Sequence, residues 1–333
     1  MKYVKTDSLN RIITENPRKL VNDSEGNYYC QLNNVCGEIS KKRNTHPVIL
    51  ISGPSGSGKT SAANEMSRIL KKNYNCDSNV ISLDNYFRSN TSPDMPRDKN
   101  GNIDLESPLC TDLKLLQEHL VLMNEGKEFM MPVFDFKKQS RSSYVPFKRE
   151  ADSLVIIEGI HALNPLVTGE NNFATCIYIS VRTRLKDRNN KILHPRIIRL
   201  IRRLCRDSLF RGRNLESIFS YFESVSEGED KYIFPFKHRA DFQIDTFMSY
   251  EVSVYKSFLY RKLSEAEQIL RNNHYYNNII EFFNILLPVS EKEVPSDSLI
   301  REFIGRDLIL LLYVYFKLYS AELIYYNIFV LCM

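Results

Sequence analysis

The chain has 333 residues, 43% of them hydrophobic, and a formal net charge of +5. This size and composition exclude a disordered chain and allow one large α/β core with extra helices, or two small domains. The modest positive charge suits anionic ligands but does not by itself indicate a nucleic-acid-binding protein.

The first 46 residues are mostly polar, with few periodic apolar positions, so we expect a short lead-in there. They lack the apolar core of a signal peptide. The seven cysteines form no CxxC pair, and several lie in apolar runs. This pattern favours buried free thiols in a reducing compartment over disulfides or a zinc site, and we expect a cytoplasmic protein.

The most informative motif follows the apolar run Val48–Ser52, which we predict to be a buried strand. A glycine-rich turn ending in Lys59 and Thr60 comes next, and an alanine-rich helical pattern covers 61–72. Strand, glycine-rich turn and helix are the context of a phosphate-binding loop. The predicted phosphate-binding residues are Gly53, Pro54, Ser55, Gly56, Ser57, Gly58, Lys59, Thr60 and Ser61.

The chemistry of this loop follows from its residue types. Glycines let successive N–H groups point at phosphate oxygens, and the helix N-terminus adds partial positive charge. Lys59 can reach the outer phosphates, and the Thr60 hydroxyl can ligate magnesium. The alternative, a turn with a solvated lysine, does not explain why the strand, the lysine and the hydroxyl coincide.

Further apolar runs predict strands at 79–83, Leu154–Glu158 and 176–180, with helical patterns at 112–124 and 195–207 between and after them. This alternation predicts an α/β fold, a parallel sheet of the P-loop NTPase type flanked by helices. Ligands of such sheets bind beyond the carboxyl ends of the strands, where the phosphate loop, Asp84 and Glu158 all fall.

Two acidic residues stand out at these strand ends. Asp84 can accept the proton of an attacking hydroxyl or cap the following turn, and the sequence leaves both roles open. Glu158 occupies the position of an acid that holds magnesium directly or through water, and Gly159 permits close backbone approach. We expect His161 to be a packed or hydrogen-bonded neighbour rather than a catalytic base.

An arginine-rich segment follows. Its arginines recur on one face of the predicted helix, at Arg196, Arg199, Arg203 and Arg206, and Arg211 and Arg213 come directly after. A solvated basic face is one interpretation. We favour a lid that closes over ATP, because a glycine separates the last two arginines and no matching acids accompany the stretch. Nucleic-acid binding is disfavoured, because no aromatic residue lies between the arginines to stack on bases.

The C-terminal part divides into two segments. Helical patterns at 251–271 and around 277–287, with a short turn at 298–304, precede a hydrophobic tail. The tail is long enough to span a bilayer, but Lys317 and Glu322 lie within it. A helix docked on the body or a partner surface is therefore preferred to membrane contact.

Together these motifs resemble the uridine kinase and phosphoribulokinase family of P-loop kinases. Besides the phosphate loop, the similarity includes Asp84 in SLDNYF, the segment PVFDF at 132–136, and Glu158 in EGI. The RD and RGR motifs at 206–213 look like the lid of that family. The resemblance covers about residues 46–306, with domains expected at 1–46 (lead-in), 47–250 (kinase), 251–306 (its helical C-terminal part) and 307–333 (tail).

A bacterial-type branch of this family looks closest. The runs 227–229 and 232–236, then Ala240 and Asp241, are similar to motifs of that branch, and 295–305 is similar to its usual ending. We expect this chain to lack the N-terminal accessory domains of that branch.

The resemblance implies transfer of the γ-phosphoryl group of ATP to the 5′-hydroxyl of uridine or cytidine, with Mg2+ as cofactor. Lys59 and the loop amides would hold the β- and γ-phosphates, Thr60 and Glu158 would position Mg2+, and Asp84 would activate the hydroxyl. Substrate and lid contacts would fall to Phe134, Gln139, Arg141, Arg203, Arg206, Arg211 and Arg213.

The acceptor side departs from the family pattern. Leu109 stands where the nucleoside kinases have an acid that grips the ribose, with Glu106 or Asp104 as substitutes. Phe134 and Gln139 replace a Tyr and a His that face the pyrimidine, which weakens discrimination. We expect a small nucleoside-like partner and no nucleic acid, and a homo-oligomer stays open. The alternatives are a kinase of another sugar-like alcohol and an ATP-binding regulatory protein.

Overall fold

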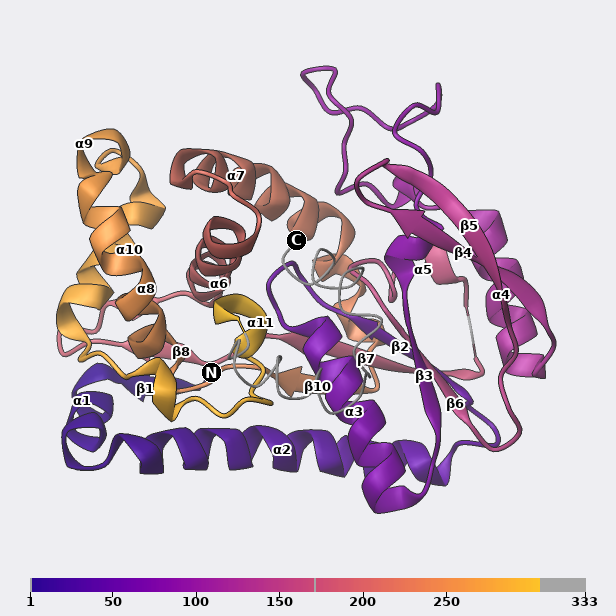
Figure 1. The fold of residues 1–333 in the computed structure, drawn as a ribbon, viewed down its shortest axis with the longest axis horizontal. Helices are drawn as coiled ribbons and strands as arrows, with labels where there is room; N and C mark the ends of the chain where they lie inside the picture. The colour runs from indigo at the N-terminus through magenta and orange to yellow at the C-terminus, as the bar shows by residue number, and fades with distance from the viewer. Residues whose placement is uncertain (1, 171, 306–333) are drawn as a thin grey trace, which may run out of the picture. The chain divides into compact units, whose positions relative to one another are not determined.

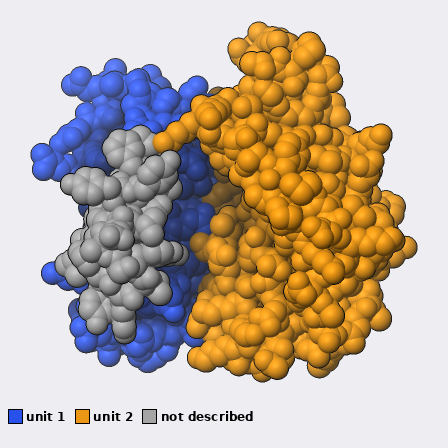
Figure 2. Space-filling view, turned by 45° about the vertical axis from the view of Figure 1, so that its right-hand side comes forward, with its two compact units in different colours: residues 1–27, 181–222, 246–333 blue, residues 28–180, 223–245 orange. Residues whose placement is uncertain are grey.

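The computed structural model describes residues 2–170 and 172–305, which divide into two compact units (Figure 2). Of the described residues, 2–27, 181–222 and 246–305 form unit 1, and 28–180 and 223–245 form unit 2. The units interleave along the chain, whereas the segments expected from the sequence are continuous. Those segments therefore stay a prediction.

Unit 2 is built on a parallel sheet of five strands in the order β10-β7-β2-β6-β3 (Figure 1). The strands are β2 (Val48–Ser52), β3 (Ser78–Ser82), β6 (Leu154–Glu158), β7 (Ala174–Ser180) and β10 (Phe242–Asp245). Every residue of β2 and β6 is buried, which explains their unbroken apolar sequences. The α/β fold and four of these strands confirm the prediction. The short β10 was not predicted, because only Ile244 is fully buried and its sequence has no unbroken apolar run.

Helices flank this sheet. They are α3 (Lys59–Tyr74), α4 (Leu113–Glu125) and the short α5 (Pro165–Thr168). Apolar residues of α4, among them Leu116 and Leu120, share one core cluster with Val48 and Leu50 of β2. The Asp112 carboxylate accepts the Leu115 N–H at 3.2 Å and so caps the start of α4.

An antiparallel hairpin of β4 (Phe129–Asp135) and β5 (Ser140–Phe147) completes unit 2, together with the short 3-10 helices η1 (Leu83–Tyr86), η2 (Pro108–Cys110) and η3 (Phe234–Arg239). The hairpin was not predicted from the sequence. Its β5 strand is largely exposed, so it lacks the apolar pattern that marks a buried strand.

The N-terminal segment differs from the expected lead-in. It folds as β1 (Tyr3–Lys5), α1 (Thr6–Glu15) and the long α2 (Pro17–Lys41). Leu32, Cys36 and Ile39 of α2 are fully buried, and the Cys36 thiol donates to the Met66 carbonyl of α3 at 3.7 Å. This apolar stripe is narrow, so the polar residues between its members conceal the helical period.

Unit 1 contains the three-stranded sheet β1-β8-β9, with β8 (Arg184–Lys186) and β9 (Ile192–Leu193). Its helices are α6 (Pro195–Phe210), α8 (Glu251–Glu265), α9 (Glu267–Leu270), α10 (His274–Ile285), η4 (Glu291–Glu293) and α11 (Arg301–Ile304). The helix expected at 251–271 is interrupted at Ala266. Helix α7 (Leu215–Tyr232) contributes its first half to unit 1 and its second half to unit 2.

Within the described residues the cysteines are all free, and Cys36, Cys76, Cys110 and Cys205 are buried, as expected for structural thiols. The same part of the chain holds no helix that is both long and apolar enough to cross a membrane. The tail 307–333 and Cys332 lie outside the described residues.

Two glycines within α2 give a paired test of this helix. A Cβ at Gly26 would meet nothing within 4 Å, whereas one at Gly37 would lie 2.9 Å from the Tyr74 hydroxyl. Because alanine is the better helix former, Gly26→Ala should raise the free energy of unfolding by about 0.5–1 kcal/mol. Gly37→Ala should gain clearly less. Urea denaturation of the two variants measures this difference, and equal gains would contradict the packing of α2 on α3.

Candidate functional site

The phosphate loop lies between β2 and α3. This agrees with the predicted order of strand, glycine-rich turn and helix. Gly56 and Gly58 have φ angles of 73° and 82°, in the left-handed region that favours glycine. A Cβ at Gly53 would overlap the backbone carbonyl oxygen of Ile179 in β7. The loop therefore accepts only glycine at Gly53, and its backbone runs directly against the neighbouring strand.

Lys59 and Thr60, the first two residues of α3, each form a hydrogen bond within the site. The Lys59 ammonium donates to the Pro54 carbonyl at 3.3 Å, across the loop, so the side chain folds back over the phosphate-binding backbone. The Thr60 hydroxyl donates to Glu158 Oε1 at 3.2 Å. Two residues that are 98 positions apart in sequence are thus brought into contact. Their role as magnesium ligands stays a prediction.

Glu158 reaches Thr60 because β6 pairs with β2 in parallel, with Ile51 and Glu158 as register partners. Only 6% of Glu158 is exposed, and a Cβ at the following Gly159 would lie 2.5 Å from Leu83 Cβ. A hydroxyl and a carboxylate are oxygen ligands of the kind that Mg2+ prefers. Three or more His, Cys, Asp or Glu side chains nowhere cluster in the described part, so such an ion would draw its other ligands from water and phosphate.

Asp84 lies in the turn η1, directly beyond β3. The cap of this turn is Ser82, whose hydroxyl accepts the Asp84 N–H at 3.3 Å, so the capping role that the sequence left open for Asp84 belongs to Ser82. Ser82 is also the register partner of Glu158. The half-buried Asp84 and the buried Glu158 therefore lie at the ends of adjacent strands, at the same edge of the sheet.

His161 is buried and packs edge-on against Tyr232, with ring centroids 6.2 Å apart. Burial lowers the pKa of His161 to about 4, and the nearby charge of Lys59 acts in the same direction. A neutral, packed imidazole agrees with the expectation that His161 is a neighbour of the site rather than its base.

Aromatic side chains gather beside the Asp84 turn. Phe134 is buried and meets the rings of Phe87 and Phe136 edge-to-face, at centroid distances of 5.8 and 5.3 Å. The Phe134 N–H donates to the side chain of Asn85, the residue after Asp84, at 3.3 Å. Phe134 is therefore tied to the turn that carries the candidate base.

Two other predicted substrate residues have partners within the protein. Gln139, in the β4–β5 turn, accepts from Asn90 at 2.8 Å and donates to the Phe136 carbonyl at 2.5 Å. Arg141 forms an ion pair with Asp112 at 3.0 Å. In this structure both side chains hold loops together, and their proposed contact with a substrate would need these bonds to be exchanged.

The segment that differs from the family pattern contains Asp104, Glu106 and Leu109. Leu109 is 47% exposed. The Asp104 carboxylate accepts the Tyr232 hydroxyl at 3.1 Å and the Glu106 N–H at 3.2 Å. The Asp104 carboxylate is therefore engaged within the protein, and Glu106 stays the other acid of this segment that the sequence offers as a substitute.

Four arginines of unit 1 surround Asp207, and we call them the arginine cluster. The sequence analysis expected no acid to pair with these arginines, and this expectation was wrong, because the fully buried Asp207 pairs with them. Arg206 contacts this carboxylate at 2.8 Å, and Arg203, Arg211 and Arg213 approach it to 3.8, 3.5 and 3.8 Å. Burial alone would raise the pKa of Asp207, but the arginines, Arg206 first, hold it below its usual value.

The cluster is not a simple solvated face. Arg199 and Arg203 are buried, and the Arg203 and Arg213 guanidinium groups lie 5.5 and 5.8 Å from the Tyr221 ring centroid. Four arginines gather on one carboxylate, which makes this a basic cluster of the kind that suits an anionic ligand. Sequence reasoning missed Asp207 although Arg203 and Arg211 lie four residues before and after it, a spacing that predicts ion pairs on a helix and could have identified it.

Comparison with known proteins finds a family model, curated relatives and a solved structure. The sequence model of the "Phosphoribulokinase / Uridine kinase family" matches residues 48–253. A uridine kinase from Lactobacillus johnsonii is 35% identical over 199 residues, which is 59% of this chain and 84% of that protein. A uridine kinase from Lactobacillus helveticus is 32% identical over 197 residues, with the same coverage. The solved structure of a possible uridine kinase from Bacillus stearothermophilus aligns with a TM-score of 0.42 and 19% identity, over 65% of this chain and 97% of that one.

The close approach of the loop to β7 leads to a first prediction for the site. Because a Cβ at Gly53 would overlap the Ile179 carbonyl, Gly53→Ala must displace the loop and should weaken ATP binding at least about tenfold. Gly26→Ala, whose Cβ meets nothing within 4 Å, is the control. Isothermal titration with ATP measures the change, and unchanged affinity would contradict this loop geometry.

A second prediction concerns pH. Between pH 6.5 and 4 the unfolded chain protonates His161 more readily than the folded chain does, so stability falls as the pH is lowered through this window. His161 should contribute about 2 kcal/mol to the difference in unfolding free energy between about pH 7 and about pH 4.5. In His161→Gln this part of the pH dependence should vanish. His238→Gln, at an exposed position of unit 2, is the control for urea denaturation at both pH values.

Proposed function

Because the chain belongs to the phosphoribulokinase and uridine kinase family, we propose that it transfers the γ-phosphoryl group of ATP to the 5′-hydroxyl of uridine or cytidine. The family makes the chain a P-loop kinase, a phosphotransferase that uses ATP as donor and acts on a small metabolite. The nucleoside identity of the acceptor is the proposed part. It is supported by the uridine kinases among the relatives.

One observation carries the proposal. The phosphate loop follows β2, Asp84 follows β3, and Glu158 is the last residue of β6, which lies between these two strands in the parallel sheet. The three groups therefore meet at a single edge, with Thr60 and Glu158 in direct contact. A phosphate-binding backbone, a pair of oxygen ligands and a further carboxylate in one row are the requirements of phosphoryl transfer to an alcohol.

The proposed roles follow from this arrangement. The loop amides and Lys59 bind the β- and γ-phosphates. Asp84 accepts the proton of the acceptor hydroxyl while the oxygen of that hydroxyl bonds to the γ-phosphorus. The bond from that phosphorus to the β,γ-bridging oxygen breaks, and ADP leaves. Thr60 and Glu158 would hold Mg2+, which neutralises charge on the phosphate oxygens when bound. The arginines around Asp207 stay a predicted lid.

The aromatic cluster supports a nucleoside as acceptor. Phe136 is exposed next to the buried Phe134, and flat apolar rings near the candidate base suit a pyrimidine ring. Glu106 would accept hydrogen bonds from the sugar hydroxyls. A kinase of another sugar-like alcohol is the second candidate, because Leu109 removes a polar contact to the ribose and the engaged Gln139 removes one to the base.

Replacement of Asp84 tests the proposal. Asp84→Asn keeps the shape of the side chain but removes the proton acceptor, so turnover with uridine or cytidine should fall by about 10²–10⁴-fold. ATP affinity should stay within about twofold, because the phosphate loop is unchanged. Asp77→Asn is a matched control, since Asp77 is exposed and lies just before the opposite end of β3.

The assay would compare uridine, cytidine and a panel of sugar alcohols as acceptors. Turnover that needs one of the sugar alcohols and is lost in Asp84→Asn would replace the nucleoside by that alcohol. ATP hydrolysis that no acceptor stimulates, and that Asp84→Asn leaves unchanged, would favour an ATP-binding regulatory protein.

A further inference from the structure

Several segments of unit 2 meet around Tyr232, the last residue of α7. Its hydroxyl donates to Asp104 Oδ2 at 3.1 Å, and its carbonyl accepts from the Asn164 side chain at 3.5 Å. One side of its ring is met edge-on by His161, and the Lys231 ammonium lies 4.6 Å from its centroid. Tyr232 is therefore held at its backbone, its ring and its hydroxyl. A hydrogen bond to a carboxylate is stronger than one between neutral groups.

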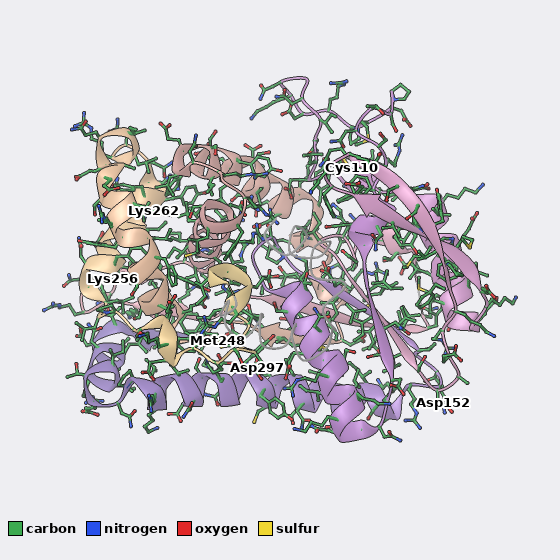
Figure 3. All side chains as sticks on the ribbon, in the orientation of Figure 1. Cys110, Asp152, Met248, Lys256, Lys262 and Asp297 are labelled. Atoms are coloured by element: carbon green, nitrogen blue, oxygen red, sulfur yellow. The ribbon has the colours of Figure 1, made fainter. Side chains whose placement is uncertain are left out.

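The partner of Tyr232 begins the acceptor loop, which we define as residues 104–112. Asp104 organises this loop with both its carboxylate and its carbonyl. Oδ1 accepts the Glu106 N–H at 3.2 Å, and the carbonyl accepts the Ser107 N–H at 3.0 Å and the Cys110 thiol at 3.2 Å. Cys110 is buried and is labelled in Figure 3. The position of Asp104 therefore fixes the first half of the loop.

Helix α7 also touches the loop through Gly228. A Cβ at this position would overlap the Cβ of Glu106. The helix backbone therefore lies directly against the acid that we propose to meet the acceptor hydroxyls, one turn before Tyr232.

The other end of the acceptor loop is bonded to the turn that carries Asp84. The Asp112 N–H donates to the Tyr86 carbonyl at 2.9 Å, and the Arg88 N–H donates to the Cys110 carbonyl at 2.8 Å. Between these bonds Phe87 and Thr111 form an antiparallel bridge. A continuous chain of hydrogen bonds thus runs from the Tyr232 hydroxyl, through Asp104 and Cys110, to the Asp84 turn.

We infer that Tyr232 is a positioning residue for the phosphoryl acceptor, because its bond to Asp104 fixes the acceptor loop and, through it, Glu106 and the Asp84 turn. This inference rests on the proposed function. Tyr232 itself needs no contact with ATP or with the reacting atoms. Its loss should therefore impair the use of the acceptor and leave the binding of ATP unchanged.

Tyr232→Phe removes only the hydroxyl and is the first test. We expect kcat/KM for uridine to fall roughly 5- to 10-fold, while KM for ATP stays within about twofold. Tyr260→Phe is the matched control, because its hydroxyl also donates one hydrogen bond, to Asn284 at 2.7 Å, far along the sequence in unit 1. Asp104→Asn combined with Tyr232→Phe should be less damaging than the sum of the two single changes, since both remove one bond.

Amide hydrogen exchange gives a test that needs no turnover. In Tyr232→Phe the amides of residues 104–112 should exchange faster, while those of the phosphate loop keep their rates. Unchanged exchange in the loop together with unchanged acceptor kinetics would overturn the inference. So would exchange that rises throughout unit 2 with equal losses for both substrates, since that marks a general stabilising contact. If the wild-type chain phosphorylates no acceptor, the proposed function fails, and loop exchange alone still decides the role of Tyr232.

Discussion

Parallel pairing of β2 with β6, and of β6 with β3, is the constraint on which the candidate site depends. Parallel strands finish at the same edge of a sheet, so whatever follows each strand is brought together there without any long-range recognition between the loops. The register of the strands determines which residues lie next to one another at this edge. Ile51 is opposite Glu158, and Glu158 is opposite Ser82, which leaves the phosphate loop, the buried acid and the Asp84 turn in one row. Burial of β2 and β6 fixes that register, since their apolar side chains fill both faces of the sheet.

The part of the site that depends on strand ends could be predicted from the sequence. Short apolar runs identify buried parallel strands, and the residues after them identify the edge. Thr60 and Glu158 were expected at this edge on this basis, and they are in contact although 98 positions separate them. The parts that could not be predicted depend on packing between segments. Asp104 and Tyr232 are 128 residues apart, and nothing local in either stretch marks them as partners. The helix α2 was missed because polar residues separate the buried positions that pack it on α3 and on other segments.

Unit 1 shows how one helix can carry two kinds of arginine. In α6 the fully buried Arg202 donates to the Glu251 carboxylate of α8 at 2.7 and 3.1 Å and to the Thr246 carbonyl at 2.6 Å. A buried ion pair of this kind is satisfied only while both partners are present, and removal of one leaves an uncompensated charge, at a cost of about 3–5 kcal/mol. The adjacent Arg203 instead faces Asp207 and Tyr221. Periodicity alone does not distinguish these neighbours, since the sequence shows two consecutive arginines and only the packing shows which one is structural.

The contact between Gly53 and β7 has an evolutionary consequence. The atom that a side chain at Gly53 would strike is the carbonyl oxygen of Ile179, which belongs to the main chain. When two side chains collide, a smaller residue at the second position can relieve the collision and the pair can drift together. Here no exchange of amino acid at Ile179 removes the oxygen, so no compensating substitution at the contact is available. The glycine can therefore be lost only together with the strand arrangement itself, and a search for suppressors of its replacement should find none within β7.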